Sequence, residues 1–265
     1  MAHASIINNY ADLPVGLYMD IIAVDRSPLG EFDKQVRIIS ILSGIAEADI
    51  LALPVPEYKR IAAATEFLIH PCQEGRMAKS YRLGDLVLVP TQDLTKITAA
   101  QYIDFQTLSQ EGEEKTVELC SVFLVPKGHK YADGYDIADV QDAIRRHLSV
   151  QDVVTLAAFF FTQVCGINRL FPNLLQAGDP AHEGPEGEGG DGGGTDGGGD
   201  DAPAAGGFAD RWGWIANVDL VSDTCRCSWD DAFRMTAIEF FNVVSYARDK
   251  AEKQKEEIRR WQRTH

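Results

Sequence analysis

Two groups of residues have side chains suited to chemistry. The first is His129, which precedes Asp133 and Asp136 in a segment with turn-forming glycines, residues 126–136. An imidazole near carboxylates is typical of proton transfer or of cation binding. The acids do not follow calcium-loop spacing, which needs alternating oxygen ligands and a distant bidentate Glu. An ordered turn with solvated charges is therefore the favoured interpretation, and a hydrolase that uses His129 with Asp133 ranks below the binding functions described later.

The second group is Cys225 and Cys227, separated by one residue. A structural zinc site needs four ligands, usually with a second close pair, and the nearest such pair, His70 and Cys72, is far away in the sequence. The sequence also has no phosphate loop ending in Gly-Lys-Ser/Thr, no GxGxxG after a strand, no HExxH and no GxSxG elbow. We predict a non-enzymatic protein with no catalytic residue, no metal and no cofactor.

The composition of the chain excludes some classes of partner and indicates a cellular compartment. The net charge of −15 argues against general binding to nucleic acid or to anionic membranes, because both require a cationic surface. The 5 cysteines are odd in number, and three of them are isolated in apolar runs, which suits a reducing compartment. The N-terminus lacks the basic and apolar regions of a secretory signal. The predicted location is the cytoplasm.

The most apolar stretch of the chain, residues 149–171, positions the other elements. Ser149 and Asp152 form a helix start of the capping-box type, and apolar side chains then fall on nearly every face. Three residues interrupt the run that a membrane span would need: Gln163, Gly166 and Asn168. We predict a buried core helix.

Apolar periodicity predicts the elements before this helix. Residues 1–70 form a helical subdomain, with a helix start at Asp12-Leu13-Pro14, a second helix ending at Gly44, a short helix at 46–51 and another from Pro56 to Pro71. The period then changes to 2, which indicates strands at 81–90 and 117–125, with a helix between them. Asp136 caps a further helix at 137–148.

Composition divides the chain into three parts. Residues 1–176 form a mainly α domain with a small β element (α+β), residues 177–207 form a disordered, acidic, Gly-rich linker, and residues 208–265 form a C-terminal amphipathic helical segment in which Ser228 caps a long helix. Its aromatic and aliphatic residues are candidate partner-binding residues: Trp212, Trp214, Trp229, Phe233, Phe240, Phe241 and Val244. The three tryptophans could equally form the core of a small unit.

The order of these elements resembles a known family. Six segments carry the resemblance: LPVGLYMDII, QVRIISILSG, PEYKRIAAATEFL, YRLGDLVLVP, ITAAQYIDFQTL and VPKGHKYADGYD. They are similar to the tail assembly chaperones of long-tailed bacteriophages, over about residues 10–172. The acidic linker departs from a minimal member of that family, and no invariant functional residue carries over.

The resemblance implies a small, mainly helical protein that keeps the tape-measure protein soluble in the host cytoplasm before the tail tube polymerises. Its partners would be the tape-measure protein or another tail protein, and a homo-oligomer is possible. A structural virion protein, such as a tail completion or connector subunit, is the alternative. A partner of a long helical protein needs apolar grooves between its helices, charged residues that keep it soluble, and a tethered segment that can extend to the client.

Overall fold

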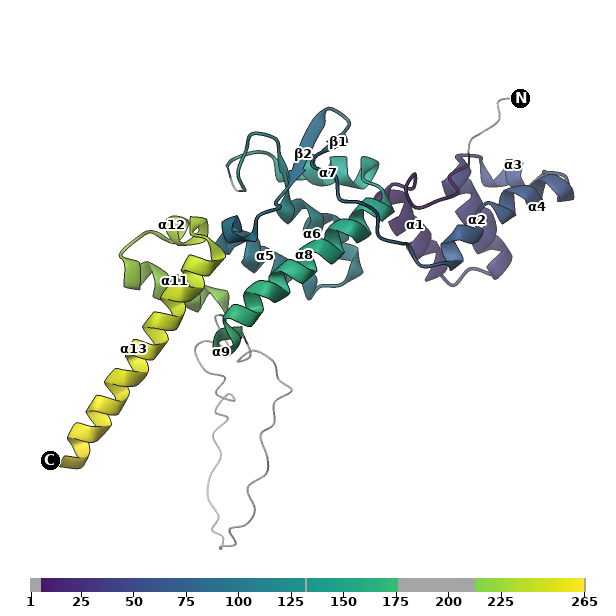
Figure 1. The fold of residues 1–265 in the computed structure, drawn as a ribbon. Helices are drawn as coiled ribbons and strands as arrows, with labels where there is room; N and C mark the ends of the chain where they lie inside the picture. The colour runs from purple at the N-terminus through teal and green to yellow at the C-terminus, as the bar shows by residue number, and fades with distance from the viewer. Residues whose placement is uncertain (1–5, 132, 176–212, 265) are drawn as a thin grey trace, which may run out of the picture. The chain divides into compact units, whose positions relative to one another are not determined.

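The chain is mainly helical with a small antiparallel sheet (Figure 1). The computed structural model describes residues 6–131, 133–175 and 213–264. Two compact units are present: unit 1 comprises Met1–Ile97 and Gln101–Cys165, and unit 2 comprises Thr98–Ala100 and Gly166–His265. These bounds differ from the predicted ones, because unit 2 also includes Thr98–Ala100 and the residues from Gly166 onward, which precede the acidic stretch. The predicted linker, residues 177–207, lies outside the described residues.

Unit 1 begins with the helical subdomain that the sequence predicts. Its helices are α1 (Val15–Asp25), α2 (Glu31–Ser43), α3 (Glu47–Leu51) and α4 (Val55–Ala63), followed by the 3₁₀ helix η1 (Glu66–Ile69). Acidic residues in the first turn of α2 favour the helix start, and Gly44, with φ of 68°, ends the helix in the left-handed conformation. Pro54 precedes α4 as its N-cap, and Pro56 stands in its first turn, where the missing N–H costs little.

Two clusters of buried residues hold this subdomain together. One joins α1 and α2 to the start of α8 through Leu13, Ile21, Leu42 and Val150. The other lies between α2, α3 and α4, around Val36, Ile39 and Ile50. The backbone N–H groups of Val15 and Val150 donate to Leu148 and Leu13 at 2.8 Å each, which ties the start of α1 to the start of α8.

The sheet has the order β1-β2-β3, all antiparallel. Its strands are β1 (Tyr81–Leu83), β2 (Leu86–Pro90) and β3 (Leu124–Pro126). The predicted strand at 81–90 is in fact two strands joined by a hairpin turn, because Gly84 has φ of 61° and Leu83 pairs with Leu86 across it.

The predicted strand at 117–125 is wrong for most of its length. Residues Thr116–Phe123 form helix α6, and only Leu124–Pro126 pair with β2. The alternation that suggested a strand fails because nearly the whole second half of α6 is buried, including the polar Ser121. A helix covered on most sides carries no clear period in its sequence.

Besides α8 (Val150–Leu170), whose last residues belong to unit 2, unit 1 has further helices. They are α5 (Ala99–Ser109) and α7 (Ile137–His147), with short 3₁₀ turns at Leu94–Lys96 (η2) and Glu113–Lys115 (η3). The Asp136 side chain caps α7 by accepting from the Ala138 N–H at 2.8 Å. The Ser149 hydroxyl accepts from the Asp152 N–H at 3.1 Å, which confirms the predicted helix start.

The prediction that α8 is buried on all sides is only partly right. Its core face includes Val153, Leu156 and Phe160, and the Phe160 ring stacks on Phe123 at 4.3 Å. Phe161 and Leu170 are 64% and 62% exposed. Among the described helices, α8 alone is long and apolar enough to cross a membrane, a test that the core helix of a soluble protein also passes.

Unit 2 contains α9 (Pro172–Leu175), α11 (Trp214–Cys225), α12 (Trp229–Arg234) and α13 (Ala237–Thr264). The predicted single helix from Ser228 is instead two helices. Ser228 and Asp231 form a capping box at the start of α12. Thr236 and Glu239 form the same exchange of hydrogen bonds at the start of α13, because the chain is extended at Met235.

Candidate functional site

An opening of about 690 Å³ lies in unit 1 between α1, α2 and η1. We call it the α1–α2 groove. Its apolar lining comes from all three elements: Ile21, Ile22, Phe32, Ile38, Leu68 and Ile69. Ile21 is only 5% exposed and belongs to the core cluster, whereas Phe32 is 56% exposed and Ile69 is 79% exposed. The floor of the groove is thus the outer layer of the core, and its edges are apolar side chains in water.

Charged residues stand at the rim of the α1–α2 groove. They are Asp25, Glu31 and Lys34, so acids outnumber bases there. Lys34 Nζ lies 3.4 Å from Glu31 Oε1, and the Lys34 side chain is 16% exposed while that of Glu31 is 92% exposed. The rim is therefore slightly acidic on its outer side.

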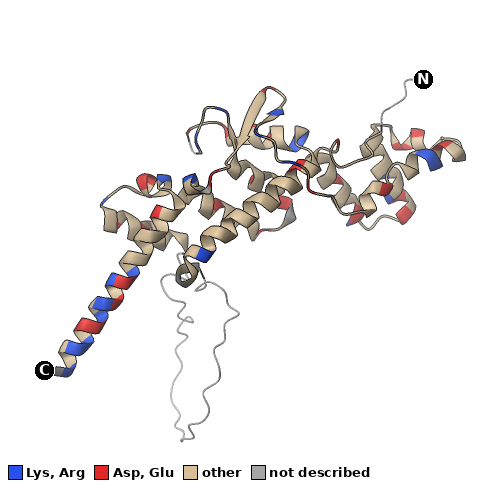
Figure 2. Cartoon of the chain, viewed as in Figure 1, with Lys and Arg blue, Asp and Glu red and all other residues tan. Residues whose placement is uncertain are grey.

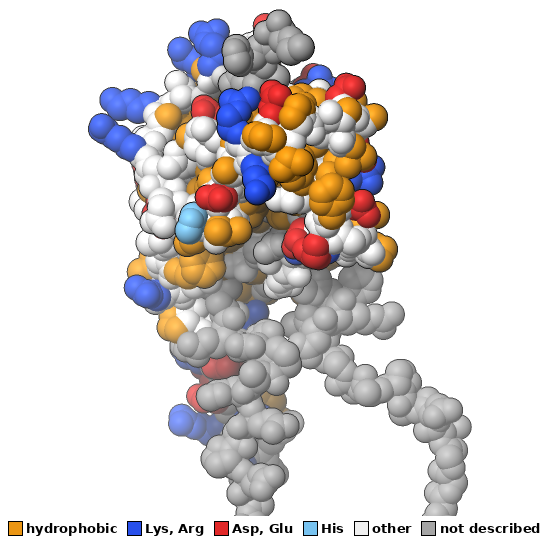
Figure 3. Space-filling view, turned by 90° about the vertical axis from the view of Figure 1, so that its right-hand side faces the viewer, with side chains coloured by type: hydrophobic (Ala, Val, Ile, Leu, Met, Phe, Trp, Pro, Cys, Tyr) orange, Lys and Arg blue, Asp and Glu red, His pale blue; other side chains and the backbone are white. Residues whose placement is uncertain are grey.

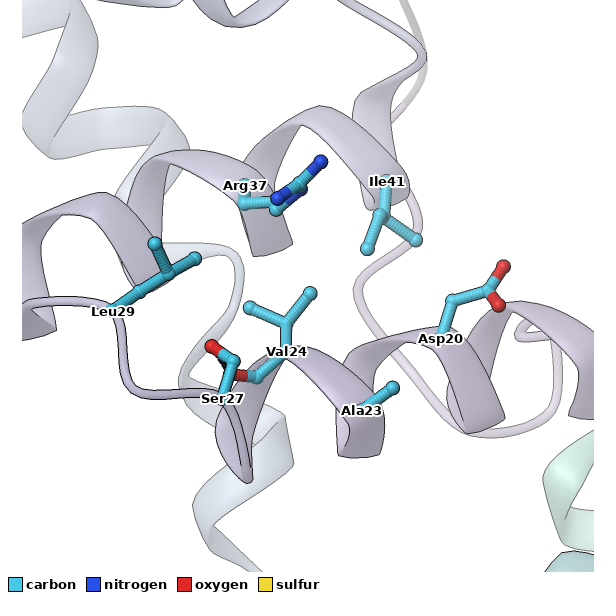
Figure 4. Close-up of a pocket in the computed structure, with 7 residues that line it drawn as sticks. All are labelled: Asp20, Ala23, Val24, Ser27, Leu29, Arg37 and Ile41. Atoms are coloured by element: carbon cyan, nitrogen blue, oxygen red, sulfur yellow. Dashed lines mark hydrogen bonds between the residues drawn. The ribbon is translucent and has the colours of Figure 1, made fainter.

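A second, smaller pocket of about 420 Å³ lies on another side of the α1–α2 pair (Figure 4). Ala23 and Val24 of α1 face Ile41 of α2 across it, with Asp20 and Arg37 as the charged groups. The Arg37 guanidinium is already paired with Glu47, its Nε 3.3 Å from the carboxylate. This pocket has fewer apolar lining residues than the α1–α2 groove and carries no argument for function.

Exposed apolar side chains also lie on α3 and α4. Leu51 is 59% exposed and Val55 is 67% exposed, and neither lines the groove. Figure 3 looks onto this end of the molecule and shows hydrophobic side chains gathered there, with acidic and basic residues between them. These two residues therefore provide matched controls for the groove residues.

The segment around His129 is built as a turn. The Asp133 carboxylate accepts from the backbone N–H of Lys130 at 2.7 Å, and the Asp136 carboxylate caps α7. The His129 ring lies edge-on to Tyr135, with centroids 5.9 Å apart. Both acids thus hold backbone N–H groups, which favours the interpretation as an ordered turn.

Tyr131 in the same segment is bound to a helix outside it. Its hydroxyl donates to the Asp104 carboxylate on α5 at 2.5 Å. Burial, and then this hydrogen bond and the negative charge of Asp104, raise the pKa of Tyr131. The tyrosine stays neutral and anchors the segment to α5.

The two cysteines of the C-terminal segment lie at the end of α11. Cys225 is exposed and Cys227 is half-buried, with Arg226 between them in the left-handed conformation at φ of 54°. Desolvation, with the nearby Cys225 and Asp231, raises the pKa of Cys227, which disfavours the thiolate that metals and electrophiles need. Among the described residues, no three of His, Cys, Asp and Glu gather as a metal site would require.

The structure separates the predicted partner-binding residues into two groups. Phe240, Phe241 and Val244 are 1–2% exposed and form the core of unit 2, so they are not available to a partner in this conformation. The rings of Phe171 and Trp214 contact the ring of Phe241, with ring centroids 5.3 Å and 6.1 Å apart. The physical reason is that α11 packs along α13 and covers its first turns.

The other predicted residues lie closer to water. Trp229 on α12 is 45% exposed, Phe233 and Trp214 are half-buried, and Trp212 lies outside the described residues. The predicted partner-binding residues on α13 thus lie in the core of unit 2, and among the described members of this set only Trp229 is a large exposed apolar side chain.

The sequence interpretation missed the α1–α2 groove. Three residues of α1 line it, Tyr18, Ile21 and Ile22, and of these only Ile21 is buried. A signal was present in Ile69, an isoleucine beside His70 and Pro71 at a helix end, where a core position is unusual.

Comparisons of the chain with protein-family models, with curated proteins and with solved structures found no match.

Proposed function

We propose that this chain is a tail assembly chaperone of a long-tailed bacteriophage, which binds apolar helical segments of the tape-measure protein in the α1–α2 groove. The observation that carries the proposal is the groove itself, about 690 Å³ in volume, with an apolar floor and exposed apolar edges. Three of the segments that resemble the family, LPVGLYMDII, QVRIISILSG and PEYKRIAAATEFL, supply most of α1, α2, α4 and η1.

Helix-in-groove binding suits such a client. An amphipathic helix presents apolar side chains at i, i+3, i+4 and i+7, and these fill a hydrophobic groove between helices. A tape-measure protein is long and helical, and its apolar stripes are exposed until the tail tube forms around it. Binding of this kind needs no catalytic group and no cofactor.

The exposed edges set the strength of binding. Covering a fully exposed Ile or Phe is worth about 1.5–3 kcal/mol. Scaling by the exposed fractions of Phe32, 56%, and Ile69, 79%, gives about 2–4 kcal/mol for the two together. At 1.4 kcal/mol per tenfold, the two side chains together should account for about 30- to 700-fold of the affinity for a client segment.

The first test is co-expression with the tape-measure protein of the same phage, with the soluble tape-measure protein as the readout. The wild-type chain should keep it soluble, and the double variant Phe32→Ala/Ile69→Ala should not. The control variant Leu51→Ala/Val55→Ala removes similarly exposed side chains outside the groove and should behave as the wild type. Equal solubility with all three chains would overturn the proposal.

The second test separates an assembly factor from a virion subunit. Purified phage particles should lack this chain, because a chaperone leaves once the tail tube has formed. Stoichiometric recovery of the chain from purified particles would instead establish the structural role.

A further inference from the structure

The far end of α13 extends beyond the core of unit 2. The first turns of this 28-residue helix are covered by α11, whereas every residue from 251 to 263 is exposed. We call residues 251–263 the α13 end. Figure 2 shows it as the part of the helix where acidic and basic residues alternate most densely.

An apolar stripe continues from the covered part of α13 into the α13 end. Ala237, Phe240, Val244 and Ala247 follow each other at intervals of three and four residues, and the same intervals continue through four further residues: Ala251, Gln254, Ile258 and Trp261. Ile258 is 56% exposed and Trp261 is 63% exposed. A seven-residue repeat of this kind is the seam by which one helix packs on another. The stripe that packs α13 into unit 2 thus ends in apolar side chains that face water.

Two copies of the α13 end pair poorly with each other. In a parallel pair, Lys250 of one helix would flank Lys255 of the other, because these are the g and e positions beside the seam. In an antiparallel pair centred on the exposed stretch, Lys255 of one helix would lie beside Lys255 of the other. Glu257 would likewise lie beside Glu257 of the other helix. Both arrangements oppose like charges, so another surface is the better partner.

The α1–α2 groove has the complementary character. Ile258 and Trp261 are accompanied by Arg259, Arg260 and Arg263, with no acid among residues 258–264. The rim of the groove carries Asp25, the 92% exposed Glu31 and Lys34, which pairs with Glu31, so its net charge is negative, and its edges are apolar. A basic helix end with two large apolar side chains fits an apolar groove with an acidic rim.

We propose that the α13 end of one copy binds in the α1–α2 groove of a second copy, which gives a head-to-tail contact between chains. The inference uses the same groove as the proposed function but does not depend on the identity of the client. The contact would also regulate client binding. When no client is bound, the α13 end of a neighbouring copy covers the groove, so the client and the α13 end compete for the same site.

Complementation between two full-length variants tests this contact by sedimentation velocity over a range of concentrations. The groove variant Ile69→Arg places a positive charge against the arginines of the tail, and the tail variant Ile258→Ser/Trp261→Ser removes its apolar residues. Wild type should self-associate, and added salt should weaken the association. Each variant alone should be at least tenfold weaker in self-association. An equimolar mixture should form a dimer, because one variant keeps an intact tail and the other keeps an intact groove.

The mixture also shows that both variants are folded, since each must supply one working site. Leu51→Arg, a charge placed at an exposed leucine outside the groove, is the matched control and should associate as the wild type does. A wild-type monomer at all concentrations would overturn the inference. So would a mixture that fails to associate. A groove variant that associates as strongly as the wild type, while the tail variant does not, would also overturn it, because that is the signature of tail-on-tail pairing.

The two proposals can fail separately. In one outcome, the groove variant loses self-association and still keeps the tape-measure protein soluble. That result supports the head-to-tail contact and rejects the groove as the client site. Loss of client solubility with unchanged self-association supports the client site and rejects the head-to-tail contact.

Discussion

Truncation of Ile69 to alanine should weaken binding in the α1–α2 groove far more than it weakens the fold. The change removes three carbon groups, each worth about 0.8 kcal/mol when taken out of water. Ile69 is 79% exposed, so about 1.9 kcal/mol of this is gained only when a partner covers it. At 1.4 kcal/mol per tenfold, the dissociation constant should rise about 20-fold. The part already buried is worth only about 0.5 kcal/mol of folding stability.

The assay is fluorescence anisotropy of a labelled peptide with the sequence of residues 248–264, titrated with the full-length chain carrying the tail variant, so that no competing tail is present. The cost of forming a helix in the short peptide is the same in every titration and cancels in the ratio. Leu51→Ala removes the same three carbon groups at a site that is 59% exposed and should leave the dissociation constant within about twofold. An unchanged dissociation constant with Ile69→Ala, alongside a stability loss of several kcal/mol, would refute the reasoning, because Ile69 would then be a core residue.

Four further predictions concern the fold. Gly16→Ala should destabilise the chain by about 1–3 kcal/mol in chemical unfolding, because an added Cβ would lie 2.6 Å from the backbone oxygen of Arg145. Gly166→Ala, inside α8 with nothing within 4 Å of the new methyl group, should instead stabilise it by about 0.5–1 kcal/mol. Phe160→Ala, at a position that is 2% exposed, should cost about 3–5 kcal/mol and lower the urea midpoint accordingly. Burial raises the pKa of Cys120 to about 12 from an ordinary value of 9.0, so the unfolded thiol ionises first as the pH rises. Stability should therefore fall between pH 9 and 12 by about 1.4 kcal/mol per pH unit from this group, and Cys120→Ala should show a correspondingly shallower decline.

Elements whose ends are fixed by local chemistry could be predicted from the sequence. Gly44 ends α2 in the left-handed conformation, Asp136 caps α7, and Ser149 caps α8, each as expected from its residue type. These signals depend on hydrogen bonds within a few residues, so they survive whatever the rest of the chain does. The mainly helical class followed from the same local patterns.

Elements decided by burial could not be predicted in the same way. The segment from Thr116 to Phe123 alternates like a strand, yet it is a helix because its neighbours cover it on most sides. The break between α12 and α13 left a local signal, Thr236 followed by Glu239, but the apolar stripe through both helices hid it. The α1–α2 groove has no local signal of this kind, because a groove is the space that three packed elements leave uncovered.

Unit 2 is assembled from separate stretches of the chain, and this has a consequence for its integrity. The Ala99 N–H donates to the Met235 carbonyl at 2.8 Å, and the Phe171 ring contacts Phe241 across the acidic stretch of sequence. An engineered protease site between residues 175 and 213 would therefore cut the backbone without separating the pieces. Both fragments would co-purify as a noncovalent pair under native conditions and come apart only in denaturant, much as the halves of a split protein do.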